Sequence, residues 1–285
     1  MEDLTLEVEE GQIFGLVGPN GSGKTTTLKL LLGLVFPTRG EAEVLGFPIG
    51  HPAYKERVGF LPEGPYFYDH LNAVELLRFY GGLFGLTGKE LEKRIQQLLE
   101  LVGMWERRHI RVRNYSRGML QRVGVAQALI NDPDLVFLDE PTAGLDPIGA
   151  MQIRDVIRRI REEGKTVFLC SHLLKEMEPL CDNIAILNRG RLVTTGAVDE
   201  LLAGPEGHYQ LRAAHVSQEA VEALKSFAVE VKLEDGELEA TFADQSLAAQ
   251  GLNTIVEKGG TVRELVPLRR SLEEVFISAV EGEGQ

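Results

Sequence analysis

A glycine-rich loop near the start of the chain constrains the fold more than any other feature. Residues 18–26 read GPNGSGKTT, and four residues separate Gly18 from the closing Gly-Lys-Thr. Glycines allow the backbone N–H groups to turn inward and close around a polyphosphate. An apolar strand over 13–17 precedes the loop and an apolar helix over 24–34 follows it, a context typical of phosphate-binding α/β folds. A plain glycine-rich turn would not require Lys-Thr at the helix start.

The residue types in this loop predict a role for each position. The predicted polyphosphate-binding set is Gly18, Pro19, Asn20, Gly21, Ser22, Gly23, Lys24, Thr25 and Thr26. The helix N-terminus adds its partial positive charge at the same place. Lys24 is expected to reach the outer phosphates, and the Thr25 hydroxyl is expected to hold Mg²⁺.

Length, charge and cysteine content limit the classes of protein this chain can belong to. The 285 residues, 44% of them hydrophobic, suffice for one large domain and a small one. A net charge of −13 argues against nucleic acid as the main ligand. Two cysteines make no disulfide framework and fit a reduced cytosolic setting. No apolar stretch approaches the roughly 20 residues of a membrane span, so we expect a chain that at most docks on a membrane protein.

Strand-like and helix-like segments alternate through the first part of the chain. The expected strands lie at 4–8, 13–17, 41–45, 58–61, 135–138, 166–170 and 184–187. Helices are expected at 89–102, capped by Thr87, and at 116–130 and 148–160, in addition to the one after the loop. This alternation predicts an α/β domain whose mostly parallel sheet is covered on both faces.

Two further segments complete the predicted domain organisation. Residues 64–122 read as a mostly helical insertion into the sheet, and 204–207 read as a linker. We therefore predict a nucleotide-binding domain over 1–204 and an accessory domain over 205–285. The latter reads strand, helix, strand, strand, helix, strand, with a final helix, which is the order of a small α+β ferredoxin-like domain.

A second chemical element follows the apolar strand at 135–138. That strand delivers Asp139 and Glu140 at its C-terminal end, where open α/β sheets place their ligands. Asp139 is expected to hold Mg²⁺ through water, and Glu140 to orient or deprotonate an attacking water. Alone, such a pair would be a solvated turn, but a complete phosphate loop elsewhere in the chain favours the catalytic interpretation.

With these motifs in place, the chain resembles the ATP-binding-cassette (ABC) ATPases from Leu4 to about Ala203. Four further stretches carry the resemblance, in the family's order: GFLPE at 59–63, YSRGMLQRVGVAQAL at 115–129, LDEPTAGLDP at 138–147 and CSHLLKEME at 170–178. The resemblance implies a P-loop NTPase (RecA-like) mixed sheet with an inserted helical subdomain, and ATP with Mg²⁺ as ligands.

The family's mechanism assigns further residues by their place in these motifs. Two cassettes stack head to tail, and each ATP lies between the phosphate loop of one and the signature segment of the other. Ser116 and the Gly118 backbone would then donate to the γ-phosphate of the partner's ATP. His172 would contact the γ-phosphate and help position the water, and Asp146 would communicate across the dimer.

Two of these stretches depart from the family pattern: the one at 115–129, which is the signature segment, and the one at 59–63, which occupies the Q-loop. The signature usually reads Leu-Ser-Gly-Gly-Gln, but Arg117 and Met119 stand here in the third and fifth places. Arg117 brings a positive charge that can compensate near phosphate, and the variant resembles exporter ATPases whose partners are separate ABC-2-type membrane chains. Glu63 replaces the usual Q-loop glutamine and is expected to face Mg²⁺; the alternative is that it points to solvent.

The start of the chain departs as well. The family normally has an earlier strand and an aromatic residue that stacks on adenine, yet no aromatic precedes Phe14. Base stacking contributes roughly 1–3 kcal/mol, so we expect either weakened nucleotide binding or an incorrectly assigned start.

The apolar residues that follow the Q-loop have two possible structural roles. Tyr66, Phe67 and Tyr68, followed by Leu71, Leu76, Leu77, Phe79 and Tyr80, form either the core of the helical insertion or a groove for a membrane subunit's cytoplasmic helix. The tail segment SLEEVFISAV at 271–280 resembles the C-terminal extension of ABC-2-type ATPases and shows no catalytic pattern.

These observations predict an ATPase subunit of an ABC-2-type transporter, an exporter by family analogy. It would act as a homodimer or paired with a different second cassette, and it would bind ABC-2-type permease subunits at the cytoplasmic face of the membrane. The alternative is a soluble ABC ATPase: translation factors normally carry two cassettes, and DNA-repair ATPases carry a long coiled coil, which no sustained heptads indicate here. A catalytically dead binding module is disfavoured because Lys24, Asp139, Glu140 and His172 are all present.

Overall fold

The computed structural model describes residues 1–203, 207–234 and 237–282, and the chain forms two compact units. The first comprises Met1–Val198 with the segment that begins at Phe276, and the second comprises Asp199–Val275. The expected linker at 204–207 lies largely outside the described residues. The assignment of 1–204 as cassette and 205–285 as accessory domain stays a prediction.

A six-stranded sheet organises the first unit, in the order β4-β5-β6-β1-β7-β8. Its strands are β1 (Ile13–Val17), β4 (Val58–Leu61), β5 (Leu135–Asp139), β6 (Thr166–Ser171), β7 (Asn183–Asn188) and β8 (Arg191–Ala197). All neighbours pair in parallel except β7 and β8, which pair antiparallel. The predicted mixed α/β sheet of a P-loop NTPase is confirmed. Strand β8, which follows the tight turn at Arg189-Gly190, was not predicted.

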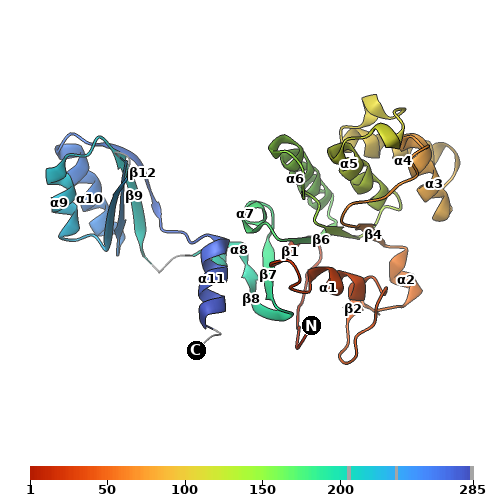
Figure 1. The fold of residues 1–285 in the computed structure, drawn as a ribbon, viewed down its shortest axis with the longest axis horizontal. Helices are drawn as coiled ribbons and strands as arrows, with labels where there is room; N and C mark the ends of the chain where they lie inside the picture. Colours follow the sequence, from red (N-terminus) through yellow and green to blue (C-terminus); the bar gives the residue numbers. More distant parts are fainter. Residues whose placement is uncertain (204–206, 235–236, 283–285) are drawn as a thin grey trace. The chain divides into compact units, whose positions relative to one another are not determined.

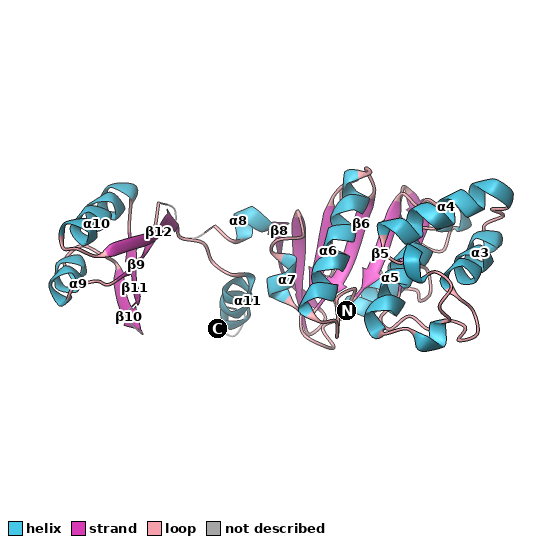
Figure 2. Ribbon diagram, turned by 90° about the horizontal axis from the view of Figure 1, so that it is seen from above, coloured by secondary structure: helices cyan, strands magenta, loops and turns pink. Residues whose placement is uncertain are grey.

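Helices cover both faces of this sheet. On one face lie α1 (Lys24–Leu31), the short α2 (Pro52–Lys55) and the β2–β3 hairpin (Glu43–Val44 with Phe47–Pro48); on the other lie α5 (Arg117–Ala128), α6 (Pro147–Glu162) and α7 (Leu174–Met177) (Figures 1 and 2). Beyond α5 stand α3 (Ala73–Leu83) and α4 (Gly88–Leu101), with single turns at Trp105–Arg107 and Val112–Asn114. This group is the predicted helical insertion.

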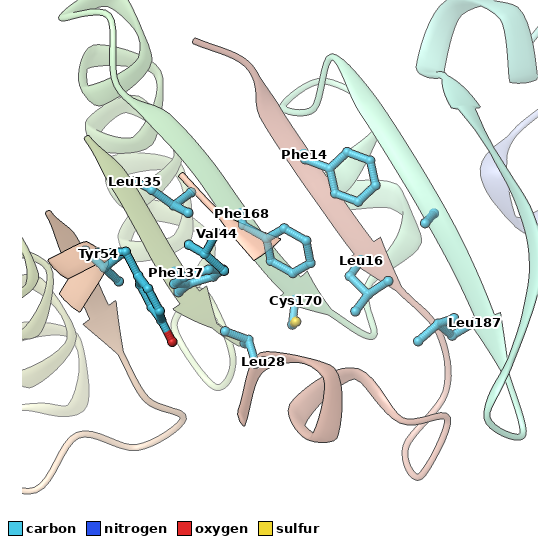
Figure 3. Close-up of a cluster of buried hydrophobic side chains, with 12 residues drawn as sticks. Phe14, Leu16, Leu28, Val44, Tyr54, Leu135, Phe137, Phe168, Cys170 and Leu187 are labelled. Carbon is cyan, nitrogen blue, oxygen red and sulfur yellow. The ribbon is translucent and has the colours of Figure 1, made fainter. Parts of the chain in front are cut away.

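The core under α1 shows why the central strands read as unbroken apolar runs. Every residue of β1 and of β5 is buried, because helices lie on both sides. On the α1 side, Phe14 stacks on Phe168 with ring centroids 5.4 Å apart, and Leu28 of α1 packs into the same cluster (Figure 3). This packing fixes the start of α1, and with it the phosphate loop, against the carboxyl ends of β1, β5 and β6.

Several expected element boundaries differ in the structure. Residues 4–8 keep their alternating exposure but are not a strand; Leu4, Leu6 and Val8 pack on the core. The strand expected at 41–45 is only the two-residue β2. Helix α1 ends at Leu31, before Gly33 at φ 65°. Thr87 precedes α4 as expected, but its side chain makes no capping hydrogen bond.

The second unit contains a four-stranded antiparallel sheet in the order β10-β11-β9-β12. Its elements are α8 (Val198–Leu201), β9 (Tyr209–Ala214), α9 (Gln218–Lys225), β10 (Glu230–Glu234), β11 (Glu237–Phe242), α10 (Gln245–Glu257), β12 (Thr261–Pro267) and α11 (Leu272–Gly282), the first and last spanning the division. The β-α-β-β-α-β order with the first strand between the third and fourth is the ferredoxin-like arrangement. The core of this unit, around Leu211, Leu238 and Phe242, is its own.

Candidate nucleotide-binding and hydrolysis site

The phosphate loop begins where β1 ends and curls back before α1. Three of its glycines, Gly18, Gly21 and Gly23, have φ between 80° and 155°, a region that L side chains rarely adopt. Gly23 serves as the N-cap of α1 without any side-chain cap, so the first N–H groups of the helix lie open at the loop. This is the geometry of an anion cradle at a helix N-terminus.

Lys24 folds back over the loop that precedes it. Its Nζ donates to the carbonyl oxygens of Gly18 at 2.8 Å and Pro19 at 3.2 Å, and only 5% of its side chain is exposed. Glu140 Oε1 lies 3.8 Å from the same nitrogen. The buried Lys24 ammonium therefore contacts both the phosphate loop and Glu140, the residue that follows β5.

Asp139 sits at the end of β5, opposite the start of α1. The Thr25 hydroxyl donates to its carboxylate, yet Oδ1 is buried without a hydrogen-bond partner in the described part of the chain. Burial raises the pKa of this carboxyl above its usual value, and the negative charges of Glu140 and Glu63 add to the increase, whereas the Thr25 hydrogen bond and Lys24 oppose it. The site thus has a deficit of positive charge.

A divalent cation fits this donor set. The Thr25 hydroxyl and the Asp139 carboxylate are hard oxygen donors, and within the described residues Asp139 Oδ1 and Ser22 Oγ are both buried without a hydrogen-bond partner. The described residues contain no group of three or more His, Cys, Asp or Glu that forms a metal cage. Mg²⁺ suits such a place because it binds through one or two carboxylates together with substrate phosphates and water.

Glu140 adopts an unusual backbone conformation, with φ at 50°. For a non-glycine residue this left-handed conformation costs on the order of 1–3 kcal/mol. The turn brings Glu140 Oε2 to 2.8 Å from His172 Nδ1, with the imidazole as donor because a carboxylate oxygen accepts. The predicted catalytic pair thus forms a direct contact, which the sequence did not indicate.

Ser171 is a site residue that the sequence analysis missed. Its carbonyl accepts from the Gly18 N–H at 3.3 Å, and its hydroxyl accepts from the Leu173 N–H at 3.0 Å. It therefore ties the turn that carries His172 to the phosphate loop. A polar residue, fully buried, at the end of the otherwise apolar strand β6 was the available signal.

The signature residues lie apart from this cluster in their own chain. Ser116 is the N-cap of α5, and its Oγ accepts from Met119 N–H at 3.3 Å. Asp146 is the N-cap of α6 and accepts from Gly149 N–H at 2.6 Å. Gly118 faces Leu145, and Arg117 lies against Gly144. Glu63 is exposed but close enough to Asp139 to influence its pKa.

A phosphate loop on a mostly parallel sheet, with an Asp-Glu pair beside its lysine and a histidine bound to the glutamate, defines a P-loop nucleoside triphosphatase. The family model described as ABC transporter matches residues 1–143. The chain belongs to the ABC transporter family, as an ATP-binding subunit.

Named relatives support this assignment. The Synechocystis sp. protein "Uncharacterized ABC transporter ATP-binding protein sll0415" is 50% identical over 210 residues, 73% of this chain, which spans 59% of that relative's length. A Nostoc sp. relative with the same description, all4389, is 43% identical over 284 residues, 99% of this chain and 83% of its own. Nod factor export ATP-binding protein I of Cupriavidus metallidurans is 41% identical over 204 residues, 71% of this chain and 67% of its own.

A solved structure supports the fold. The dimeric ATP-binding cassette MJ0796, in a post-hydrolysis state bound to ADP and Pi, superposes with a TM-score of 0.62 at 26% identity, over 68% of this chain and 88% of that one. In the part of the chain that the structure describes, each helix is too short or too polar to span a bilayer.

Proposed function

We propose that this chain is the Mg²⁺-dependent ATPase subunit of an ABC-2-type exporter, acting as a homodimer on separate permease subunits at the cytoplasmic face of the membrane. The observation that carries the proposal is the buried cluster of Lys24, Asp139 and Glu140 with His172. These groups converge where the helix α1 begins, and all but His172 are less than a tenth exposed.

Each member of the cluster has a separate task. Lys24 and the loop N–H groups bind the phosphates of ATP. Thr25, Asp139 and Glu63 would hold Mg²⁺, and the ion would supply positive charge to the transferred phosphoryl group. Glu140 accepts the proton of the attacking water or orients that water, and His172 fixes the Glu140 carboxylate through Nδ1.

A second cassette would complete the site. Ser116, Arg117 and Gly118 begin α5 on an exposed or half-buried surface, and Asp146 begins α6 beside them. In the described residues no hydrogen bond or ion pair joins them to the phosphate loop of their own chain. A head-to-tail partner would offer its phosphate loop to them. The dimeric state of the MJ0796 cassette supports this arrangement.

The Glu140→Gln variant tests the composite site. Removing the base is expected to lower ATP hydrolysis by about 100-fold or more, while Lys24 and the loop still bind ATP. With Mg²⁺ and ATP the variant should therefore accumulate as a dimer, measured as its mass in solution, and revert to monomer when the ion is chelated. Glu163→Gln, an exposed residue at the end of α6, is the matched control. A monomer that hydrolyses ATP at the wild-type rate would refute the assignment.

An apolar surface on the helical insertion supports the membrane partner. Phe67, Leu76 and Leu77 are buried and form core, as one reading of the sequence held. Tyr66, Tyr68 and Phe79 remain exposed, at 88%, 52% and 43%, and Tyr68 packs edge-on against Phe79 at 5.7 Å. Exposed aromatics of this kind are enriched at interfaces, and two of them, Tyr66 and Tyr68, closely follow Glu63 in the chain.

The partner proposal is tested in native membranes. Tyr66→Glu should prevent co-purification of an ABC-2-type permease, identified by mass spectrometry, and abolish transport, while ATP binding persists. Leu83→Glu, also on the insertion and 67% exposed, is the control and should leave both unchanged. If the Tyr66 variant still co-purified with the permease, the aromatic surface would not be the docking surface.

A further inference from the structure

Arg117, which departs from the family signature, contacts a different motif of its own chain. Arg117 is the first residue of α5, and its guanidinium lies beside Gly144. If Gly144 carried a Cβ atom, that atom would lie 2.9 Å from Arg117 Nε and closer still to Arg117 Cζ. Gly144 belongs to the loop at 143–146 that joins the end of β5 to α6. Arginine has therefore taken space that is available only because residue 144 has no side chain.

In a second contact between the same two segments, the loop at 143–146 supplies the side chain and α5 supplies the glycine. Leu145 Cδ2 lies 3.8 Å from the position of a Cβ on Gly118, an ordinary packing distance. In each case a side chain from one segment covers a glycine of the other. The loop itself is held by the hydrogen bonds from Ala143 N–H to Glu140 O and from Leu145 N–H to Thr142 O, both 3.2 Å.

Arg117 does not stabilise the helix that it begins. A cation in the first turn of a helix opposes the macrodipole and is mildly unfavourable. The first turn of α5 contains no acidic residue that would compensate, and the Arg117 side chain is exposed. The structure shows Arg117 packed beside Gly144 instead.

We propose that Arg117 is a positioning residue that clamps the 143–146 loop of its own chain, and through that loop fixes the backbone leading from Asp139 and Glu140 to Asp146. The inference rests on the proposed hydrolytic role of Glu140. It differs from the sequence-based expectation that Arg117 compensates charge at the phosphates of a partner's ATP. The planar guanidinium lies against the glycine, and a lysine cannot reproduce that flat contact.

The first experiment uses the nucleotide-free protein, so that it needs no partner, ATP or transport. Hydrogen exchange of the amides at 143–146 is compared in the wild type, Arg117→Ala and Arg117→Lys. Loss of one packing contact should speed exchange roughly three- to tenfold in both variants. Arg113→Ala, which removes an exposed arginine from the preceding turn, is the control and should leave these amides unchanged.

A double-mutant cycle separates the clamp from backbone strain. Gly144 has φ at 69°, so Gly144→Ala is strained in any background, and with Arg117 present the added Cβ also displaces the guanidinium from the glycine. We expect Gly144→Ala to lower kcat by roughly tenfold more in the wild type than in Arg117→Ala, a non-additivity typical of residues in contact. Equal effects in the two backgrounds would overturn the proposal.

Steady-state kinetics separate the two roles of Arg117. The clamp predicts a lower kcat with an unchanged KM for ATP in Arg117→Ala, and no rescue by Arg117→Lys. A raised KM that Arg117→Lys restores would overturn the clamp in favour of charge compensation at phosphate. Unaltered exchange at 143–146 would also overturn it, whereas failure of ATP hydrolysis in the wild type would instead refute the proposed function.

Discussion

Two adjacent acids at the end of β5 are stabilised to different degrees by their neighbours. Glu140 contacts both Lys24 and His172. Asp139 has the Thr25 hydroxyl, but one oxygen is buried without a partner. A buried acceptor left unsatisfied costs on the order of 1–3 kcal/mol. The protein without its ligands therefore carries a local destabilisation at the position where Mg²⁺ is proposed to bind.

Asp139→Asn should make the ligand-free protein more stable, by about 1 kcal/mol, because it removes the buried charge and keeps an oxygen that accepts from Thr25. The same change should abolish the increase in unfolding temperature that Mg²⁺ adds to ATP. Thermal unfolding in the presence of chelator, of ATP with chelator and of ATP with Mg²⁺ measures both effects. A variant less stable than wild type without ligands would contradict the argument from burial.

The two cysteines should be unreactive in the folded protein. Cys170 and Cys181 are both buried, and burial raises the pKa of each thiol, so little thiolate forms at pH 8. A colourimetric disulfide reagent should label neither cysteine within the time in which it labels both in denaturant. Rapid modification of the native protein would show that β6 or the segment after α7 opens readily.

At the scale of elements, two glycines on either side of α5 should respond oppositely to the same substitution. A Cβ on Gly59 of β4 would overlap the backbone carbonyl of Ala128, where α5 ends on the sheet. A Cβ on Gly82, in the exposed part of α3, would meet nothing within 4 Å. Gly59 is thus required by the close approach of a helix end to a strand, and Gly82 is not.

Gly59→Ala should destabilise the protein by about 1–3 kcal/mol through overpacking against backbone. Gly82→Ala should stabilise it by up to about 1 kcal/mol, the difference in helix propensity. Denaturant unfolding, with the midpoint and slope both fitted, measures the pair. If both variants shifted in the same direction, the packing of α5 on β4 would not be the cause.

Helix starts and buried strands were predictable because single residue types determine them. Ser116, Asp146 and Asp244 each cap a helix that begins one residue later, as their side chains accept from the N–H three positions on. Strands β1 and β5 were predictable from unbroken apolar runs. Strands whose formation depends on a partner strand were not predictable. Residues 4–8 alternate like a strand but pair with no strand in the described chain, and β8, which pairs with β7, was not predicted.

The candidate site was predictable residue by residue but not as a set of contacts. The motifs named Lys24, Asp139, Glu140 and His172. The contact of Glu140 with His172 requires both the positive φ of Glu140 and the turn held by Ser171, and neither is encoded in a local pattern. Likewise, Arg117 was noticed as a departure, but its contact with Gly144 depends on tertiary packing.

At the scale of the whole molecule, the two units have separate hydrophobic cores. Phe242 in the second unit is fully buried among Leu211, Leu224 and Leu238, whereas Leu16 is fully buried in the first. The phosphate loop and its acids all lie in the first unit. The single tryptophan, Trp105, also lies there, beside α4, with the Arg108 guanidinium 4.1 Å from its ring centroid. Its fluorescence therefore reports on the unit that is proposed to bind ATP.

Mg²⁺ with ATP should raise the unfolding temperature of the first unit and leave that of the second unchanged, because a ligand stabilises only what it binds. Tryptophan fluorescence follows the first transition, and hydrogen exchange of the β11 amides follows the second. Phe242→Ala, which should cost about 3–5 kcal/mol, is expected to lower only the second transition, and Leu16→Ala only the first. If Phe242→Ala lowered the tryptophan-detected transition as much as Leu16→Ala does, the units would unfold as one, and the accessory unit would stabilise the cassette directly.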